Sequence, residues 1–420
     1  MKLRLALLLA AATVAAPNVL VQTRELLAQE STSAANPALD PVLAAWINAG
    51  GKDASKLPAS VLDKELTVAE SKQLGKQLWS AWQAAHREQA AKAIADKSLN
   101  VGDVELKWLE RRFGDDKAES RPLFISMHGG GGAPKAVNDQ QWQNQIRLYE
   151  PSEGIVVAPR APGNTWDLWH QGHIDPLFDE LITSYVIAER VDPNRVYLMG
   201  YSAGGDGVYQ VAPRMADRFA AASMMAGHPN ETQAFGLRNL PFAIFMGGND
   251  SAYNRNKIAG EWSTKLDELQ KADADGYVHI SKIYPGKGHW MDREDREALP
   301  WMLGFQRRHS PKVVKWRQDD VTHSGFYWLE LAEPSDAKAG QEVTAVIDGQ
   351  TIAITTESTA KLRLRLSDEL VDLEQPVKVT WNGKSVFEGR VKRTAGGLVQ
   401  TLAAYRDPFR MRSAAIEVGP

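Results

Sequence analysis

Cysteine is missing from all 420 residues of the chain. Its absence excludes disulfide bonds, thiolate metal sites, a cysteine nucleophile and a lipid anchor carried on cysteine. It does not point to one compartment, because exported proteins can also do without cysteine.

An excess of charge of one sign is missing as well. The chain has 49 Lys and Arg residues against 52 Asp and Glu residues, which gives a formal net charge of −3. With no basic block and no RNA-binding motif, a nucleic-acid partner is not expected. The remaining composition, 43% hydrophobic and 24% charged residues, is that of an ordinary globular protein. The length exceeds what one compact core usually holds, so two or three domains are expected.

Apolar runs long enough to span a membrane are also absent from the sequence. At the N-terminus, Lys2 and Arg4 precede the short apolar run Leu5–Ala12, and the small residues Ala15 and Ala16 follow. This order is typical of an export signal. We therefore expect a periplasmic or secreted protein without a stable membrane span, although the pattern does not fix the cleavage site.

The sequence pattern changes three times along the chain. The expected division is a signal peptide and mature start at 1–30, a helical N-terminal segment at 31–100, an α/β domain at 101–309 and a β-sandwich-like domain at 310–420. In the α/β part, short apolar runs alternate with helical patterns, which predicts a mostly parallel sheet covered by helices on both faces. In the last part, strand-like segments separated by turn signals follow one another with no convincing helix.

The helical N-terminal segment contains a well-defined helix start. Thr67 and Glu70 form a capping box, and Leu74, Leu78 and Trp82 follow as one apolar stripe. We expect this helix to pack as an appendage that carries no chemistry.

The strongest chemical signal is the motif Gly200-Tyr201-Ser202-Ala203-Gly204. A strand is predicted directly before it and a helix directly after it, which is the setting of a nucleophile elbow. The glycines allow close backbone packing around a sharp turn. Ser202 is therefore the expected nucleophile.

A serine nucleophile needs a base and an acid, which in this architecture follow it in the order acid, then histidine. Asp250 comes directly after the predicted strand Phe242–Met246, and His289 comes after the next predicted strand, Val278–Tyr284. We expect Asp250 to orient His289 and His289 to take the Ser202 proton. Asp292 is the alternative acid.

The oxyanion hole should consist of two backbone N–H groups, one of them from the residue after the nucleophile, Ala203. The glycine run Gly129–Gly132, which follows His128 at the end of a buried strand, should supply the other. We favour Gly130, but the sequence does not separate it from Gly129 or Gly131. A phosphate-binding loop is excluded because the Lys-Ser/Thr of that motif is missing.

Aromatic and histidine residues near these loops are the candidates for substrate contacts. Trp166 and Trp169, together with His128, are expected to line the pocket, although the two tryptophans fit a packing role equally well. His170, His173 and Asp175 are close in sequence, but no metal is expected there because Asp175 has the position of a helix cap.

The segment from Val191 to Gly205 resembles the sequence around the nucleophile in bacterial esterases of the polyhydroxybutyrate-depolymerase and feruloyl-esterase type, and in related predicted peptidases. The resemblance covers about Val101 to Arg308. It implies an α/β-hydrolase fold, hydrolysis of carboxylic esters and no cofactor. By the same motifs, Ser202 resembles the family nucleophile, Asp250 the acid and His289 the base. The helical N-terminal segment and the β-rich tail are not part of the minimal enzyme.

These observations predict a serine hydrolase that cleaves small-molecule or polymer-linked carboxylic esters through an acyl-enzyme. One alternative is a serine peptidase of the prolyl-oligopeptidase type, which uses the same three residues. The other is a non-catalytic surface binding protein on a hydrolase scaffold. The ester hypothesis is favoured over the peptidase because no charged motif for a peptide terminus is present. The substrate's identity and the oligomeric state stay open.

Overall fold

The computed structural model describes residues 39–115 and 117–420. The expected signal peptide and mature start, 1–30, lie outside the described residues. Leu39–Pro420 form one compact unit, and the domain boundaries at 100 and 309 stay predictions. No helix in the described part of the chain is long and apolar enough to cross a membrane.

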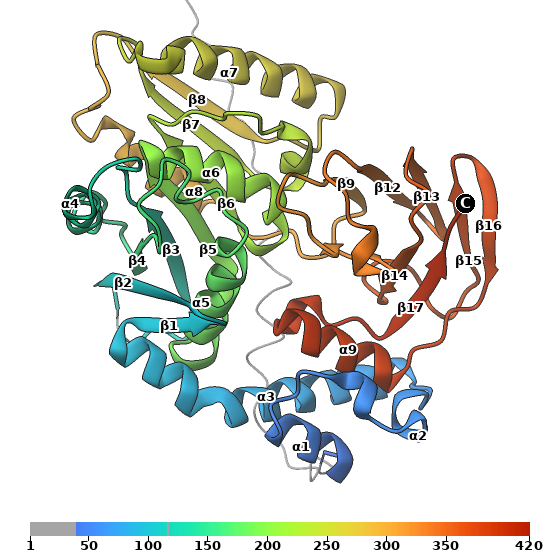
Figure 1. The fold of residues 1–420 in the computed structure, drawn as a ribbon. Coiled ribbons are helices and arrows are strands. Elements are labelled where there is room, and N and C mark those ends of the chain that lie inside the picture. The colour runs from blue at the N-terminus through green and yellow to red at the C-terminus, as the bar shows by residue number, and fades with distance from the viewer. Residues whose placement is uncertain (1–38, 116) are drawn as a thin grey trace, which may run out of the picture. The chain divides into compact units, whose positions relative to one another are not determined.

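An eight-stranded sheet organises the first part of this unit (Figure 1). Its strand order is β1-β2-β4-β3-β5-β6-β7-β8. The first two pairings, β1 with β2 and β2 with β4, are antiparallel, and all later pairings are parallel. The strands are β1 Ser98–Val101, β2 Val104–Phe113, β3 Arg121–Met127, β4 Gly154–Arg160, β5 Val191–Tyr201, β6 Ala221–Met225, β7 Phe242–Gly247 and β8 His279–Tyr284. The expectation of a mostly parallel sheet is therefore confirmed.

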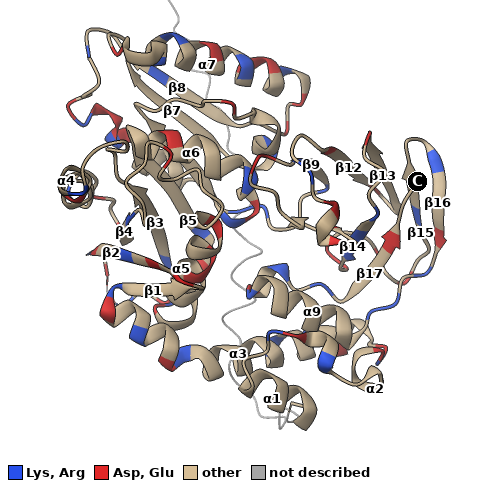
Figure 2. Cartoon of the chain, in the orientation of Figure 1, with Lys and Arg blue, Asp and Glu red and all other residues tan. Residues whose placement is uncertain are grey.

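Helices cover both faces of this sheet, and the side chains of β3 show the division. Leu123 and Ile125 point into a core shared with α5, α6 and α7, whereas Phe124 points into a second core shared with α4 and α8. Because β3 is buried on both faces, its sequence is almost continuously apolar. The helices are α4 Lys135–Gln145, α5 Ile174–Ala188, α6 Ala203–Arg214, α7 Arg255–Ala272 and α8 Ala298–Leu303. Acidic and basic residues are interspersed along the outer helix α7 (Figure 2).

The N-terminal helices pack against the end of the chain. The long helix α3 begins at the predicted capping box, in which the Thr67 N–H donates to Glu70 Oε2 at 2.8 Å. Leu78 and Trp82 of this helix are buried in a core with Leu398 and Leu402 of α9. The helices of this layer are α1 Pro41–Asn48, α2 Ala59–Leu62, α3 Val68–Asp96 and α9 Ala395–Tyr405.

The C-terminal part contains two facing sheets and one helix. The strands of one sheet run in the order β10-β11-β14-β17, and those of the other in the order β16-β15-β13-β12-β9. Their apolar side chains share a core. The strands are β9 Val313–Arg317, β10 Gly325–Phe326, β11 Leu329–Leu331, β12 Glu342–Asp348, β13 Thr351–Thr356, β14 Leu362–Leu366, β15 Val377–Trp381, β16 Lys384–Gly389 and β17 Ala414–Val418.

The expectation that this part contains no helix is wrong, because α9 lies within it. Two glycines near its start, Gly396 and Gly397, lower the helix propensity of the sequence. The structure gives Gly397 a packing reason: a Cβ there would lie 2.6 Å from the backbone carbon of Ser413. The tertiary contact therefore overrides the local preference.

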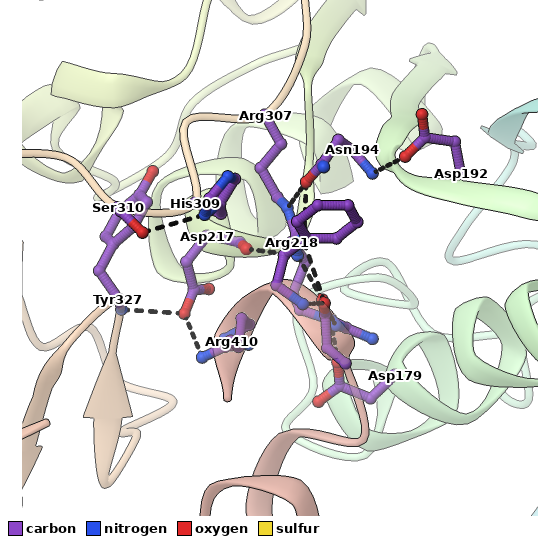
Figure 3. A network of polar contacts seen from close by, with 12 residues as sticks. Asp179, Asp192, Asn194, Asp217, Arg218, Arg307, His309, Ser310, Tyr327 and Arg410 are labelled. Carbon is purple, nitrogen blue, oxygen red and sulfur yellow. Dashed lines mark hydrogen bonds and ion pairs between the residues drawn. The ribbon is translucent and has the colours of Figure 1, made fainter. Parts of the chain in front are cut away.

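A buried network of charges joins the two parts of this unit (Figure 3). Asp407, after α9, accepts hydrogen bonds from Arg307 Nη1 at 2.6 Å and from Arg218 Nη1 at 3.0 Å. Asp217, after α6, pairs with Arg410 and also accepts from the Tyr327 N–H at 3.0 Å. Residues from both sides of position 309 thus depend on one another for charge neutralisation.

Candidate active site

Ser202 lies at the junction of β5 and α6 in a strained backbone conformation. Its φ is 59° and its ψ is −123°, a region that residues other than glycine rarely adopt. The Ser202 N–H donates to the Met225 carbonyl at 2.9 Å, which fixes the turn against the end of β6. The strand, the serine and the helix therefore follow one another as the sequence predicted.

The flanking glycines allow this turn to pack closely. A Cβ on Gly200 would lie 2.2 Å from the Gly204 carbonyl oxygen, and one on Gly204 would lie 2.1 Å from the Met127 carbonyl oxygen. Neither contact is sterically possible, so both positions require glycine.

His289 and Asp250 lie beside Ser202. His289 Nε2 is 2.9 Å from Ser202 Oγ, and His289 Nδ1 is 2.7 Å from Asp250 Oδ2. Both residues follow the carboxyl ends of neighbouring parallel strands, β7 and β8, which places them at one edge of the sheet. Because a carboxylate only accepts, Nδ1 carries the proton and Nε2 is left to accept from the serine hydroxyl.

Burial differs sharply within this constellation. The Asp250 side chain is 2% exposed and the His289 side chain is 44% exposed. The alternative acid, Asp292, is not brought to the imidazole, because its carboxylate pairs with Lys287 Nζ at 2.8 Å. Asp250 is therefore the carboxylate beside His289.

Tyr201, which the sequence analysis did not single out, holds the loop that carries His289. Its hydroxyl donates to the His289 carbonyl at 2.6 Å and accepts from the Met291 N–H at 3.1 Å. Its ring also packs edge-on against the imidazole, 6.0 Å between centroids. The variable residue before the motif serine thus holds the His289 loop in place. Nothing in the motif pattern itself gives this role.

Asp206 is a second residue that the sequence analysis missed. It lies in the first turn of α6, and its Oδ1 accepts from the His228 N–H at 2.6 Å. Burial raises the pKa of Asp206 to about 6, against the opposing effects of the His228 hydrogen bond and of Arg255. A signal was available, because Asp206 is four residues after Ser202 and so lies on the same side of the helix.

The loop after β3 is held in place by His128. The His128 Nδ1 donates to the Gly129 carbonyl at 2.6 Å, and its Nε2 accepts from the Ala161 N–H at 3.1 Å. These two bonds require the neutral imidazole, and burial lowers the pKa of His128 to about 4. His128 is completely buried, so it orders the loop from behind and does not line a pocket as expected.

The same hydrogen bond decides where the next N–H points. The Gly129 carbonyl and the Gly130 N–H belong to one trans peptide group, so they point in opposite directions. With the carbonyl held toward His128, the Gly130 N–H faces away from that ring. The Gly131 N–H, by contrast, already donates to Asn138 Oδ1 at 2.8 Å. Gly130 has a φ of 108°, and a Cβ there would lie 2.3 Å from Asn138 Oδ1.

The two predicted tryptophans have different environments. Trp166 is 63% exposed and lies against the glycine loop, where a Cβ on Gly132 would be 3.6 Å from Trp166 Cβ. Trp169 is fully buried, donates from Nε1 to the His128 carbonyl at 2.9 Å and packs near Phe178. The expectation that Trp169 lines the pocket is therefore corrected to a packing role.

Trp290 is a further exposed aromatic residue near Ser202 and His289 that the sequence analysis did not name as a contact. It directly follows His289, is 48% exposed and lies 5.7 Å from the Tyr201 ring. Of His170, His173 and Asp175, which are close in sequence, Asp175 is held in two ion pairs. Asp175 Oδ1 pairs with Arg214 at 2.7 Å, and Asp175 Oδ2 pairs with His323 at 2.7 Å.

The chain is similar to known carboxylic-ester hydrolases. It is 33% identical over 195 residues to a bifunctional acetylxylan esterase/xylanase, XynS20E, from Neocallimastix patriciarum, covering 44% of this chain and 26% of that protein. It is 29% identical over 153 residues to feruloyl esterase B from Thermothelomyces thermophilus, covering 34% of this chain and 50% of that enzyme. It is 26% identical over 168 residues to a poly(3-hydroxybutyrate) depolymerase from Ralstonia pickettii, covering 35% of this chain and 34% of that enzyme.

The chain thus spans between about a quarter and a half of the length of these relatives. Among solved structures, a thermostable esterase aligns with a TM-score of 0.39 at 18% identity, covering 50% of this chain and 62% of that one. No protein-family model matches the chain. The resemblance to feruloyl esterases and polyhydroxybutyrate depolymerases inferred from the sequence is confirmed.

Proposed function

We propose that this chain is a serine esterase of the α/β-hydrolase fold, with Ser202 as nucleophile, His289 as general base and Asp250 as the acid that orients it. One observation carries the proposal: a single imidazole lies within hydrogen-bond distance of both Ser202 Oγ, at 2.9 Å, and Asp250 Oδ2, at 2.7 Å. The similarity to ester hydrolases supports the reaction class.

In the first step, Ser202 Oγ attacks the ester carbonyl carbon while its proton passes to His289 Nε2. Asp250 keeps the other ring nitrogen protonated and stabilises the imidazolium that forms. The imidazolium then protonates the leaving alcohol. In the second step, His289 activates a water molecule that cleaves the acyl group from Ser202.

The negative charge that develops on the carbonyl oxygen needs two N–H donors. The Ala203 N–H is free for this purpose because it lies at the first position of α6, where a helix has no internal acceptor for it. Gly130 is proposed as the second donor, because the His128–Gly129 hydrogen bond aims its N–H away from the buried ring. The positive end of the α6 dipole adds to the stabilisation.

The proposed substrate is a small-molecule or polymer-linked ester that carries a flat apolar group. Trp166 and Trp290 present exposed rings on the two loops that border the serine, one beside the glycine loop and one beside His289. Exposed aromatic rings at a site bind flat rings or sugar faces well. One relative is named a feruloyl esterase, and a feruloyl ester carries such a flat aromatic ring; another is named an acetylxylan esterase, whose name fits a polymer-linked ester.

We further propose that the enzyme is exported, on the strength of the N-terminal pattern of Lys2, Arg4 and the apolar run Leu5–Ala12. Fractionation of cells that express the full chain, followed by intact-mass measurement of each fraction, tests this. Recovery from the cytoplasm alone, at the mass of the uncleaved chain, contradicts it.

The experiment that tests the enzymatic proposal compares p-nitrophenyl acetate hydrolysis by the wild type, Ser202→Ala and the control Ser152→Ala. We expect kcat to fall by about 10⁵- to 10⁶-fold in Ser202→Ala, because the nucleophile is removed. Ser152 is an exposed loop residue, so its variant should match the wild type. Feruloyl esters, acetylated sugars and a peptide amide complete the panel. A folded Ser202→Ala protein with wild-type turnover contradicts the proposal, and faster cleavage of the amide than of any ester redirects it to a peptidase.

A further inference from the structure

Three carboxylates from two distant segments meet beside helix α6. Glu231 lies in the loop after β6, and Asp319 and Asp320 lie in the loop between β9 and β10. One carboxylate oxygen from each of the three lies within 4.8 Å of the others. This acidic triplet therefore joins the part of the chain that carries Ser202 to the C-terminal sheets.

The triplet accepts hydrogen bonds from neutral groups, namely Gln210 Nε2 and the N–H groups of Asp320 and Val321, but it has no paired cation among the described residues. Within residues 39–115 and 117–420, no Lys, Arg or His forms an ion pair with Glu231, Asp319 or Asp320. Arg214, which lies near Asp319, is already engaged, because its guanidinium binds Asp175 Oδ1 at 2.7 Å and the His170 carbonyl at 2.9 Å.

Buried polar atoms around the triplet lack partners. Gln210 is completely buried and donates from Nε2 to Glu231 Oε1 at 3.0 Å, so its amide group is aimed at the triplet. In the described part of the chain, the Oε1 of that same amide has no hydrogen-bond partner. Thr232 Oγ1, next to Glu231, and His170 Nε2 are also buried without a partner among these residues. His170 is 7% exposed. Burial lowers the pKa of His170, and the nearby carboxylates of Glu231 and Asp320 oppose that shift.

Buried polar atoms are nearly always satisfied by protein, by ordered water or by an ion. A hydrated cation at the triplet would account for both observations at once. The carboxylates would bind the ion, and its water molecules would donate to Gln210 Oε1 and to His170 Nε2. The two observations concern different side chains, because the charge cluster comes from exposed or half-buried carboxylates and the unsatisfied atoms belong to the buried side chains of Gln210, Thr232 and His170.

We propose that Glu231, Asp319 and Asp320 form a binding site for a hard divalent cation, with Ca²⁺ as the preferred ion. The ligand atoms are all carboxylate oxygens. Oxygen ligands of this kind favour hard cations such as Ca²⁺ and Mg²⁺ over softer transition metals, which prefer sulfur or imidazole nitrogen. The triplet is partly exposed and leaves room for several water ligands, which suits the six to eight flexible ligands of Ca²⁺ better than the strict octahedron of Mg²⁺.

Bound there, the cation would clamp the loop after β6 to the C-terminal sheets. The same loop carries the His228 N–H that donates to Asp206 at 2.6 Å, and Asp206, Gln210 and Arg214 follow Ser202 at intervals of four residues along α6. The clamp therefore acts on the wall of the proposed active site. The cation site itself does not rest on the esterase proposal.

Isothermal titration calorimetry of the full chain, stripped with EDTA, tests the site with CaCl₂ and, in a separate titration, with MgCl₂. We expect one saturable Ca²⁺ site with a Kd of about 0.1 to 1 mM, the range of extracellular calcium sites. Glu231→Gln and Asp320→Asn should each weaken binding by about tenfold or more. Glu357→Gln, which removes an exposed carboxylate elsewhere in the C-terminal part, should bind like the wild type.

Thermal unfolding gives a second readout. If the three carboxylates only supported the fold and bound no cation, the Tm would not depend on Ca²⁺. At one Ca²⁺ concentration near the wild-type Kd, Ca²⁺ should raise the Tm of the wild type and of Glu357→Gln clearly more than that of Glu231→Gln. In EDTA, Glu231→Gln should be at least as stable as the wild type, because it removes charge repulsion and keeps an acceptor for Gln210. Absence of saturable Ca²⁺ binding overturns the proposal, as does binding that is unchanged in both variants. Tighter binding of Mg²⁺ than of Ca²⁺ overturns the assignment of the ion.

Discussion

Two clusters of charged and polar side chains in this chain each join distant segments, but they differ in what the contacts leave available. At the triad, Asp250 is buried while the His289 side chain is 44% exposed and Ser202 is half-buried. In the buried charge network that joins the two parts of the unit, the side chains of Arg307 and Asp407 are 0% and 1% exposed. The first cluster leaves the Ser202 side chain and the His289 imidazole partly open to solvent, and the second is closed.

The difference shows what burial does to paired charges. Burial alone would raise the pKa of Asp407, but Arg307 and Arg218 outweigh that effect and hold the pKa well below its usual range. Arg218 also pairs with Asp179 at 2.6 Å, so the three arginines of the network, Arg218, Arg307 and Arg410, face three aspartates. Ion pairs closed off in this way can only stabilise or specify the fold. In the triad, a single buried carboxylate holds one side of an imidazole and leaves the other side free to accept a proton. The predictions below test this contrast in order of expected effect.

The largest effect is expected for Asp250→Asn. The amide cannot keep Nδ1 of His289 in the required protonated form, so kcat on an aryl ester should fall by about 10⁴-fold. Steady-state kinetics measure the loss, and circular dichroism checks the fold. Asp292→Asn is the matched control, because that carboxylate pairs with Lys287 instead. If Asp292→Asn loses more activity than Asp250→Asn, the assignment of the acid is wrong.

The next largest effect is expected for Asp407→Asn, and it concerns stability. Arg307 and Arg218 would be left as buried charges without their shared carboxylate. We expect the free energy of unfolding in urea to fall by about 3 to 5 kcal/mol. The kcat of the folded fraction should stay close to that of the wild type. A loss under about 1 kcal/mol would contradict the view that this network joins the two parts, and Asp348→Asn, at an exposed turn, serves as the control.

A smaller, pH-dependent effect is expected for Asp206→Asn. The folded pKa of Asp206, about 6, lies above its usual value of 3.8. Between these two values the unfolded carboxyl is ionised while the folded one holds its proton, so the contribution of Asp206 to stability falls as pH rises and levels off above about pH 6.

Asparagine keeps an acceptor for the His228 N–H and removes the buried charge. Relative to the wild type, Asp206→Asn should therefore gain about 1 to 3 kcal/mol of unfolding free energy between pH 4 and pH 7.5. Urea unfolding at a series of pH values measures this difference. A difference that is constant over the whole range contradicts the assigned environment of Asp206.

The smallest effect is expected for Trp166→Ala. Because Trp166 is 63% exposed, its removal should change the stability by no more than about 0.5 kcal/mol. The KM for an aryl ester should rise several-fold, with little change in kcat, and Trp166→Phe should restore most of the binding. Unchanged KM values for all esters of the panel would remove Trp166 from the substrate site.

Much of the candidate site follows from local sequence, because strand ends and glycines fix backbone geometry. The elbow around Ser202 and the placement of Asp250 and His289 after successive parallel strands could be predicted for this reason. Other features depend on contacts between distant segments. The burial of Trp169 against His128, the helix α9 despite its glycines, and the hold of Tyr201 on the His289 loop have no signal in any single window of sequence.

The most direct test of the central claim is the reaction of the protein with a fluorophosphonate, followed by mass spectrometry of the digested adduct. The reagent modifies only a serine that a neighbouring base activates. We predict one adduct per chain, located on the peptide that contains Ser202, and no adduct in His289→Gln. An adduct on another residue, or labelling that persists in Ser202→Ala, would contradict the assignment of Ser202 as the nucleophile.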